Sequence, residues 1–257
     1  MKPSRSTPAE DLYAGMAERY GRFHGRFGQH NSAEVAFFRT LVQENRVQCV
    51  LDCACGTGRH LHLLHSLGCE VMGSDLSGSM LAQAERNLAA LGVRVPLSQV
   101  DYRELPGHVG QAFDAVLCLS SSILHMPNET EVLRAFQSMR AVLRPEGILV
   151  LTQGTTDRQW ADKPRFVLAV NERDFSRLFV IDYEGPGARY HVLDISHGEE
   201  TQGLEVWSVH YPRVYLRDDQ ERLLREAGFQ KVAFYGTYGF DPYDKDASQR
   251  LIAVGWK

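Results

Sequence analysis

Apolar residues along the chain alternate between short continuous runs and stretches with helical spacing. Five apolar runs have the length of buried strands: 48–52, 70–75, 96–101, 113–119 and 148–152. Helical spacing separates them, as in the segment 59–67, where Leu61, Leu64 and Leu67 share one side. Continuous apolar strands separated by helices predict an α/β fold, with a mostly parallel sheet covered by helices on both faces.

Capping residues mark two of the predicted helix starts. Ser77 can cap a helix that continues to Gly92, where a missing Cβ suits a left-handed stop. Asn128 and Glu131 have the spacing of a capping box in front of the next helix. After residue 216 we expect one more helix, 217–227, and two final strands at 231–237 and 250–255 that pair antiparallel.

The segment between residues 165 and 216 lacks helical spacing. It contains three strand-like runs, at 178–183, 190–195 and 204–211, separated by turn-forming and polar residues. We therefore predict a small antiparallel β insertion over 163–213, within a main domain made of 48–162 and 214–257. Residues 1–47 are predicted to form an N-terminal helical cap.

Composition narrows the class of protein. The chain has 257 residues, 44% of them hydrophobic, and a formal net charge of −4, which is typical of a globular protein. No apolar run approaches the ~18 residues of a membrane helix, so we expect a cytoplasmic protein without a membrane partner. The 28 basic residues are scattered, and we expect no nucleic-acid partner. Five cysteines without C-x-x-C spacing predict buried thiols and no metal site.

The candidate chemistry begins where the first strand ends. Residues 50–58 form an apolar strand that leads into a glycine turn, and such a turn lies at the ligand-binding edge of a parallel sheet. Gly56 and Gly58 permit close approach of a ligand to the backbone. Asp75, which lies 23 residues after Asp52, can accept hydrogen bonds from both hydroxyls of a ribose. These residues predict a nucleoside site.

Two features bear on which nucleoside binds. Leu61 stands where the dinucleotide fingerprint has its third glycine. Asp52 places a negative charge before the turn, which repels phosphate and suits an ammonium or sulfonium group. The nucleoside site also fits a nicotinamide-dependent oxidoreductase or a non-catalytic nucleoside-binding module, and the sequence leaves both alternatives open.

The same residues resemble the class I S-adenosylmethionine-dependent methyltransferases. The likeness covers about 50–152 and rests on the acid-x-Gly-x-Gly-x-Gly motif, with Ala54 at the first glycine. It implies a Rossmann-like, seven-stranded, mostly parallel sheet and S-adenosyl-L-methionine as cofactor. By the resemblance Met80 packs near the adenine, Asp101 and Tyr102 read its edge, and the Leu119 carbonyl meets the cofactor's amino group. The implied cofactor-binding residues are Tyr20, Asp52, Ala54, Gly56, Thr57, Gly58, Asp75, Leu76, Met80, Asp101, Tyr102 and Leu119.

Within that family the chain is most similar to glycine N-methyltransferase and its small-molecule relatives. The similarity lies in 113–119 with the following Ser122 and His125, in Tyr211-Pro212, and in Phe240-x-Pro242-Tyr243. It makes three residues catalytic candidates: His125, Tyr211 and Ser121, the last at the position of an active-site asparagine. For His125 a core-packing role is an equal alternative.

The acceptor side departs from that enzyme. Gly154 stands where its arginine holds the glycine carboxylate. Arg165 or Arg173 could take over that contact, because a guanidinium matches a carboxylate bidentately. With Tyr243 they form the predicted substrate-binding set.

The resemblance implies methyl transfer to a small molecule. We expect N-methylation of an amine or amino acid, with O- or C-methylation of an aromatic or quinone-like molecule as the alternative. An amine acceptor must arrive unprotonated, and His125 or a tyrosine could remove its proton. We expect the insertion and the N-terminal helix to close over the site as a substrate lid. A homo-oligomer is possible.

Overall fold

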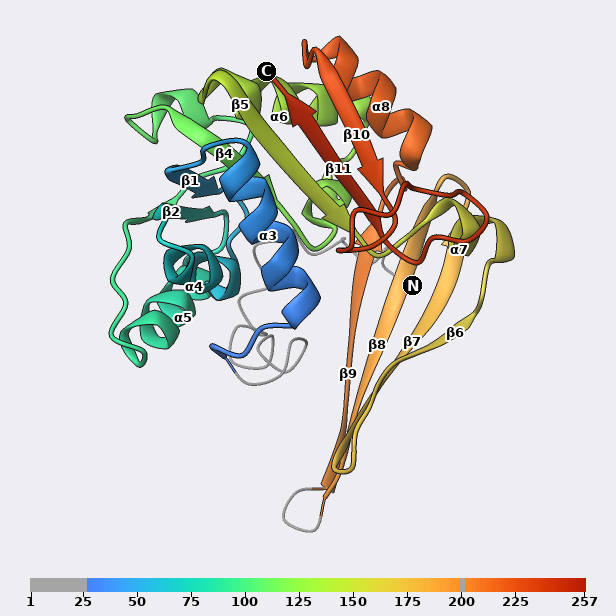
Figure 1. Cartoon of the computed structure of the whole chain (residues 1–257). Coiled ribbons are helices and arrows are strands. Elements are labelled where there is room, and N and C mark those ends of the chain that lie inside the picture. Colours follow the sequence, from blue (N-terminus) through green and yellow to red (C-terminus); the bar gives the residue numbers. More distant parts are fainter. Residues whose placement is uncertain (1–26, 199–201) are drawn as a thin grey trace.

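A computed structural model describes residues 27–198 and 202–257. Its main body is a seven-stranded sheet of order β10-β11-β5-β4-β1-β2-β3 (Figure 1). The strands are β1 (Cys49–Asp52), β2 (Glu70–Asp75), β3 (Leu97–Gln99), β4 (Phe113–Cys118), β5 (Leu143–Gln153), β10 (Lys231–Tyr235) and β11 (Leu251–Trp256). Every neighbouring pair from β3 to β5 is parallel, and β11 runs antiparallel to both β5 and β10. The predicted fold class is confirmed.

Helices cover both faces of this sheet (Figure 1). On one face lie α3 (Ser32–Glu44), α4 (Arg59–Ser66) and α5 (Gly78–Ala89); on the other lie α6 (Glu129–Ala141) and α8 (Arg217–Glu226). Short helices η2 (Leu105–Gly107), η3 (Ser122–His125) and α7 (Asp157–Asp162) occupy the connections. None of the helices in the described ranges has the length and apolar character needed to cross a membrane.

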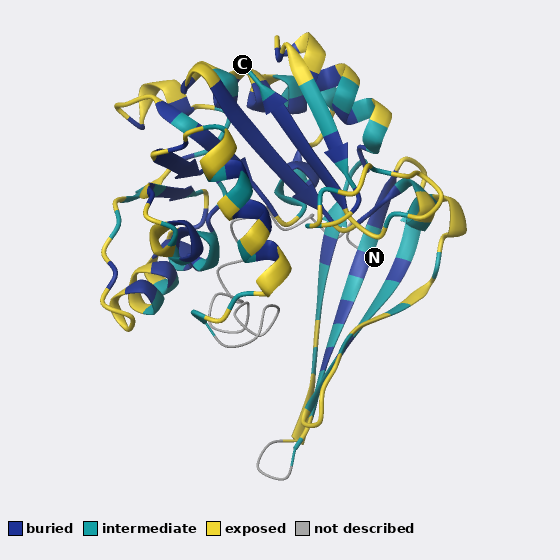
Figure 2. Ribbon diagram, viewed as in Figure 1, coloured by how far each residue is buried: buried dark blue, intermediate teal, exposed yellow. Residues whose placement is uncertain are grey.

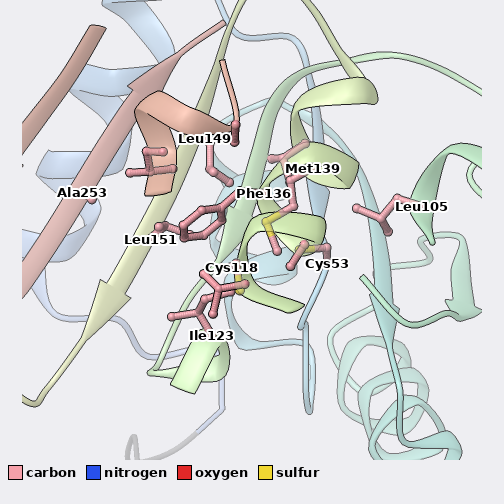
Figure 3. Close-up of a cluster of buried hydrophobic side chains, with 14 of the residues drawn as sticks. Cys53, Leu105, Cys118, Ile123, Phe136, Met139, Leu149, Leu151 and Ala253 are labelled. Atoms are coloured by element: carbon pink, nitrogen blue, oxygen red, sulfur yellow. The ribbon is translucent and has the colours of Figure 1, made fainter. Parts of the chain in front are cut away.

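The core beneath α6 and α8 is densely apolar. Phe136 and Met139 of α6 are fully buried against Leu149 of β5 and its neighbours (Figure 3). Figure 2 shows the central strands as an almost uninterrupted buried band. Burial of this apolar area, at roughly 25 cal/mol per Å², makes the sheet a rigid support for the loops at its edge.

The predicted N-terminal cap has a different place where it is described. Phe37 and Phe38 of α3 are 0% and 2% exposed and pack with Val50, Leu64 and Ile252 on the main sheet. Helix α3 is thus part of the helical layer of the main domain. Residues 1–26, which include Tyr20, lie outside the described residues.

The insertion is a second, four-stranded antiparallel sheet that extends away from the main body as a long leaf (Figure 1). Its strands, in spatial order, are β6 (Phe166–Asn171), β7 (Phe175–Glu184), β8 (Gly187–His197) and β9 (Gln202–Tyr211). One face, here called the inner face, carries the directly paired Val167, Phe179, Val192 and Trp207. Trp160 of α7 packs against this face.

Candidate active site

The carboxyl ends of β1, β2, β4 and β5 meet at one edge of the main sheet. Beyond β1 the chain continues into α4 on one face, and beyond β4 it continues through η3 into α6 on the other. The strands β1 and β4 are direct neighbours. This divergence is the topological switch point, where open α/β sheets bind their ligands.

The glycine turn after β1 has the backbone conformation that the sequence predicts. Gly56 and Gly58 have φ values of 51° and 87°, and Gly58 is the residue from which α4 starts. A Cβ on Gly58 would lie 3.2 Å from the Ala84 Cβ of α5. The turn therefore needs glycine both for its dihedral angles and for the close packing of α4 on α5.

Asp75 ends β2 directly beside this turn. Its Oδ2 accepts a hydrogen bond from the Gly56 N–H (2.8 Å) and its Oδ1 accepts one from the Ser77 N–H (2.9 Å). Burial raises the pKa of the carboxyl, and these backbone bonds oppose the rise. A carboxylate oxygen can accept two hydrogen bonds, so each oxygen is fixed in place and keeps capacity for a ligand hydroxyl.

Asp52, at the end of β1, is a carboxylate held in the interior. It is 1% exposed and accepts a long hydrogen bond (3.3 Å) from the Ala54 N–H. Burial raises its pKa to about 6; nearby His60 opposes this rise, and Asp75 adds to it. A cationic group beside Asp52 would offset the cost of keeping this carboxylate charged.

The other predicted cofactor residues line the same edge or support it. The Thr57 carbonyl accepts a hydrogen bond from Asn87 Nδ2 (3.0 Å), and Met80 is buried below Ser77 with its N–H 3.4 Å from the Ser77 Oγ. Leu76 is 41% exposed next to Asp75. The Leu119 carbonyl accepts hydrogen bonds from the N–H (3.2 Å) and Oγ (2.7 Å) of Ser122.

Asp101 and Tyr102 sit beyond β3 in a network that the sequence did not predict. Both carboxylate oxygens of Asp101 accept from the Arg103 Nε at 3.0 Å, and Arg103 also pairs with Glu131 of α6. Arg103 holds the pKa of Asp101 below its usual range, although burial opposes this. The Tyr102 hydroxyl donates to the Ser122 carbonyl (3.1 Å), which ties this loop to η3.

The segment after β4 is locally strained. Ser120 and Ser121 both have left-handed backbone conformations, with φ values of 57° and 66°. Their N–H groups donate to the Oγ1 and carbonyl of Thr152 (2.9 and 2.8 Å), and the Ser121 Oγ accepts from the Gly154 N–H (3.2 Å). Non-glycine residues in this region cost of order 1 kcal/mol each and cluster at functional sites.

A cavity of about 610 Å³ opens from this strained segment. Its wall is formed by residues 120–121, 154–156 and 248–250, by α7, and by the inner face of the insertion sheet. Ser121 and Tyr211, two of the predicted catalytic residues, both line this cavity. Its volume lies within the range of sites for small-molecule ligands.

Three aromatic side chains connect η3 to the cavity wall. The Tyr211 ring lies edge-on to the His125 ring, with centroids 5.2 Å apart, and contacts Tyr190 at 5.5 Å. The Tyr190 hydroxyl is 2.7 Å from the Thr155 Oγ1. Burial lowers the pKa of His125 to about 4, so its imidazole is neutral at pH 7 and supports the Tyr211 ring.

The chain is similar to known methyltransferases. A family model described as a methyltransferase domain matches residues 50–147. The glycine/sarcosine N-methyltransferase of Parasynechococcus marenigrum is 39% identical over 220 residues, which are 81% of this chain and 72% of that protein. The dTDP-4-amino-2,3,4,6-tetradeoxy-D-glucose N,N-dimethyltransferase of Saccharopolyspora spinosa is 31% identical over 226 residues, covering 83% and 85% of the two chains.

The chain belongs to the class I S-adenosylmethionine-dependent methyltransferases. The fold agrees, since a methyltransferase structure from Clostridium acetobutylicum superposes with a TM-score of 0.76 at 17% identity, covering 95% of this chain and 98% of that one. The oxidoreductase and the non-catalytic module that the sequence left open are thereby set aside.

S-adenosyl-L-methionine is the cofactor of this methyltransferase, and its donor and charge requirements fit the site. Asp75 presents two fixed carboxylate oxygens beside the glycine turn, as a ribose diol requires. Asp52 supplies a buried negative charge a few residues before that turn, which suits a cofactor with two positive groups.

The three predicted substrate-binding residues do not line the cavity. Arg165 is exposed and pairs with Asp182 at the surface (3.4 Å), and Arg173 is exposed in the turn between β6 and β7. The Tyr243 hydroxyl donates to the Asp157 carboxylate (2.7 Å) and accepts from the Asp157 N–H (3.0 Å). Tyr243 therefore holds the start of α7, which does line the cavity.

The arginines that the structure places on the wall are Arg158, Arg177 and Arg250, and sequence reasoning missed them. One signal for Arg250 was available. Because β11 runs antiparallel to β5, the residue before β11 must lie at the edge where β5 ends. No comparable signal existed for Arg177, since an alternating strand does not reveal which of its faces is turned toward a ligand.

Proposed function

We propose that this methyltransferase N-methylates a small-molecule amine held in the cavity between the main sheet edge and the insertion. The observation that carries the proposal is that Ser121, just beyond β4, and Tyr211, from the insertion, both line the cavity. Strand β4 pairs directly with β1, which leads into the glycine turn, and β1 pairs with β2, which ends at Asp75. The similarity to N-methyltransferases of amino acids and amino sugars supports nitrogen as the acceptor atom.

The chemistry divides between cofactor and chain. When bound, S-adenosyl-L-methionine supplies an electrophilic methyl group. The chain has to bind the amine, align its lone pair and exclude water. Tyr211, held by His125 and Tyr190, forms a fixed wall for this purpose. Because the His125 imidazole is neutral, it does not repel the positive charge that forms on the amine when it is methylated.

The low pKa of His125 argues against a general base at that position, because an imidazole with a pKa of about 4 is a weak acceptor for an ammonium proton. The site is then expected to select the neutral amine, and kcat/KM should rise with pH as the acceptor deprotonates.

A second candidate is O- or C-methylation of an aromatic or quinone-like molecule. It is favoured by the aromatic lining of the cavity, where Phe179, Trp207, Tyr190 and Tyr211 contribute. Incubation with isotope-labelled S-adenosylmethionine and a panel of amines, amino acids, amino sugars and phenols separates the two. Label found on nitrogen supports the proposal, and label found only on phenols or ring carbons rejects it.

We also propose that the protein acts in the cytoplasm, since all five cysteines are free and buried, as in a reducing compartment. Its acceptors are small molecules rather than nucleic acids, in keeping with a net charge of −4.

A homo-oligomer formed through the outer face of the insertion sheet is part of the proposal. Leu168, Leu178, Leu193 and Val206 form one directly paired apolar row on that face, and Leu168 and Val206 are 58% and 60% exposed. Such a row favours association with a second copy. Light scattering on Leu168→Lys should then give a lower mass than on the parent protein, and equal masses would reject the proposal.

A further inference from the structure

The three arginines on the cavity wall differ in their partners. Arg158 pairs with Asp162 (3.5 Å), and the buried Arg177 forms a bidentate pair with Asp194 (2.5 and 2.7 Å). Arg250 makes no ion pair with a carboxylate among residues 27–198 and 202–257. Its guanidinium carbon lies 4.6 Å above the Tyr238 ring, and its Nη1 is 3.3 Å from the Tyr238 hydroxyl.

Tyr238, which holds Arg250, is itself fixed from the main domain. Its hydroxyl donates to Glu34 of α3 (2.9 Å), and its ring packs on Phe37 with centroids 5.5 Å apart. Glu34 also contacts His60 at 3.3 Å. Arg250 is thus a positioned cation, because the ring below it is anchored to α3, whose Glu34 in turn contacts His60 of α4.

The space next to Arg250 is open. Leu251 pairs with Gln153, so the antiparallel register sets Arg250 opposite Gly154. A Cβ built on Gly154 would meet nothing within 4 Å. Both residues line the cavity. Because Gly154 has no side chain, the space opposite Arg250 is free for an anionic group of a ligand.

The inner face of the insertion gives the same cavity an apolar floor. The row Val167, Phe179, Val192 and Trp207 crosses all four strands, and every member lines the cavity. Amines as small as glycine would leave most of its 610 Å³ to water, whereas larger ligands usually fill sites of this size. The floor favours an acceptor with an apolar body.

We propose that the acceptor is an amine that carries both an apolar body and an anionic group, and that Arg250 binds the anionic group while the floor binds the body. This inference rests on the proposed N-methylation and names its substrate class. A guanidinium can bind a carboxylate through two parallel hydrogen bonds, and contact with Tyr238 holds the Arg250 guanidinium in place. Arg250 is then a specificity-determining residue.

The test compares acids with their neutral amides in the presence of S-adenosylhomocysteine. Phenylalanine and phenylalaninamide are one such pair, and leucine with leucinamide is another. Calorimetry should show the acid binding roughly tenfold or more tightly than the amide, the difference of one charge-assisted bidentate contact. In Arg250→Gln this preference should vanish. If no acid in the panel outbinds its amide, or if the preference survives in Arg250→Gln, the inference is overturned.

Matched variants separate a local role from a general loss of structure. Arg213→Gln removes another guanidinium that lies over a tyrosine ring, 5.5 Å from the Tyr215 centroid, but it is off the cavity and should keep the acid preference. Val192→Phe narrows the floor and should weaken phenylalanine binding, whereas Val180→Phe adds the same ring to the outer face, outside the apolar row described above, and should not. If the two substitutions to phenylalanine changed the affinity for phenylalanine equally, the role of the floor would be overturned.

Methyl transfer measured on the same panel keeps the two proposals distinguishable. Amines that are methylated with no acid preference would overturn this inference alone. Transfer to phenols and to no amine would overturn the proposed function, and with it this inference.

Discussion

At the scale of single residues, Asp75 is the proposed link between the glycine turn and the ribose of the cofactor. Replacing it by alanine removes the acceptor of the Gly56 and Ser77 N–H groups as well as the two oxygens that we propose bind the ribose. We expect Asp75→Ala to weaken S-adenosylhomocysteine binding by about 1–3 kcal/mol, the usual cost of stranding buried partners. Calorimetry measures this, with the exposed Asp174→Ala as control. Unchanged affinity in Asp75→Ala would show that the ribose binds elsewhere.

The raised pKa of Asp52 makes both the stability of the fold and the binding of the cofactor depend on pH. In the folded protein its pKa of about 6 lies above the ordinary 3.8, so ionisation of Asp52 destabilises the fold. The stability that the neutral acid contributes is therefore lost as the pH rises from the ordinary pKa through the folded pKa. A cationic cofactor favours the ionised form. Near pH ~5.5, S-adenosylmethionine binding should therefore release a proton from Asp52.

Calorimetry in two buffers of different ionisation enthalpy measures that release. Asp52→Asn should release fewer protons, and the cofactor should bind it more weakly at neutral pH. Proton uptake on binding, or the same release in Asp52→Asn, would contradict the electrostatic role given to this carboxylate.

The sequence was informative about residues whose chemistry is local. The glycine turn needs its dihedral angles wherever it occurs, and Asp75 is the last residue of β2, so both could be recognised from spacing alone. Arg250 and Arg177 reach the cavity only through strand pairing. Arg165 and Arg173 have the same side chain and point to the surface. Residue type alone therefore could not tell the arginines that line the cavity from those at the surface.

At the scale of elements, Tyr243 contributes two hydrogen bonds to the start of the short helix α7. The Tyr243 hydroxyl bonds both the N–H and the carboxylate of Asp157, the first residue of α7. Tyr243→Phe should lower the free energy of unfolding by about 0.5–1.5 kcal/mol and raise the acceptor KM, because α7 lines the cavity. Cofactor affinity should stay unchanged.

Steady-state kinetics and urea unfolding test this, and Tyr235→Phe on the adjacent strand β10 is the control. A Tyr243→Phe enzyme with an unchanged acceptor KM would mean that α7 does not shape the acceptor site. An equal loss in Tyr235→Phe would indicate a general packing effect.

The elements that were predicted are those with strong local signals. Ser77 and Asn128 cap α5 and α6 as expected, through bonds to the N–H groups of Met80 (3.4 Å) and Glu131 (3.0 Å). Strand β6 was missed because it is a largely exposed edge strand with no apolar alternation. Helix α7 was missed because its six residues include none that is buried.

At the scale of the whole molecule, the alternation of apolar runs was enough to predict a doubly covered parallel sheet, because that pattern has few other solutions. The same reasoning predicted a helical cap over residues 1–47, of which residues 27–47 are described. Within the described part, helix α3 packs on the main sheet, and an amphipathic helix does not reveal from sequence which sheet it covers.

The position of α3 predicts the effect of truncating its core residue. Phe37 is completely buried between α3, β10 and the 236–240 segment. Phe37→Ala should destabilise the whole protein by about 3–5 kcal/mol, measured by urea unfolding. The exposed Leu204→Ala in the insertion should cost much less. A small loss in Phe37→Ala would mean that α3 is a detachable cap.

The most direct test of the account is a crystal structure of the protein soaked with S-adenosylhomocysteine. The ribose hydroxyls are expected to lie on the Asp75 carboxylate, with the sulfur at the sheet edge from which Ser121 and Tyr211 line the cavity. A ligand bound away from the glycine turn, or a sulfur facing away from that cavity, would contradict it.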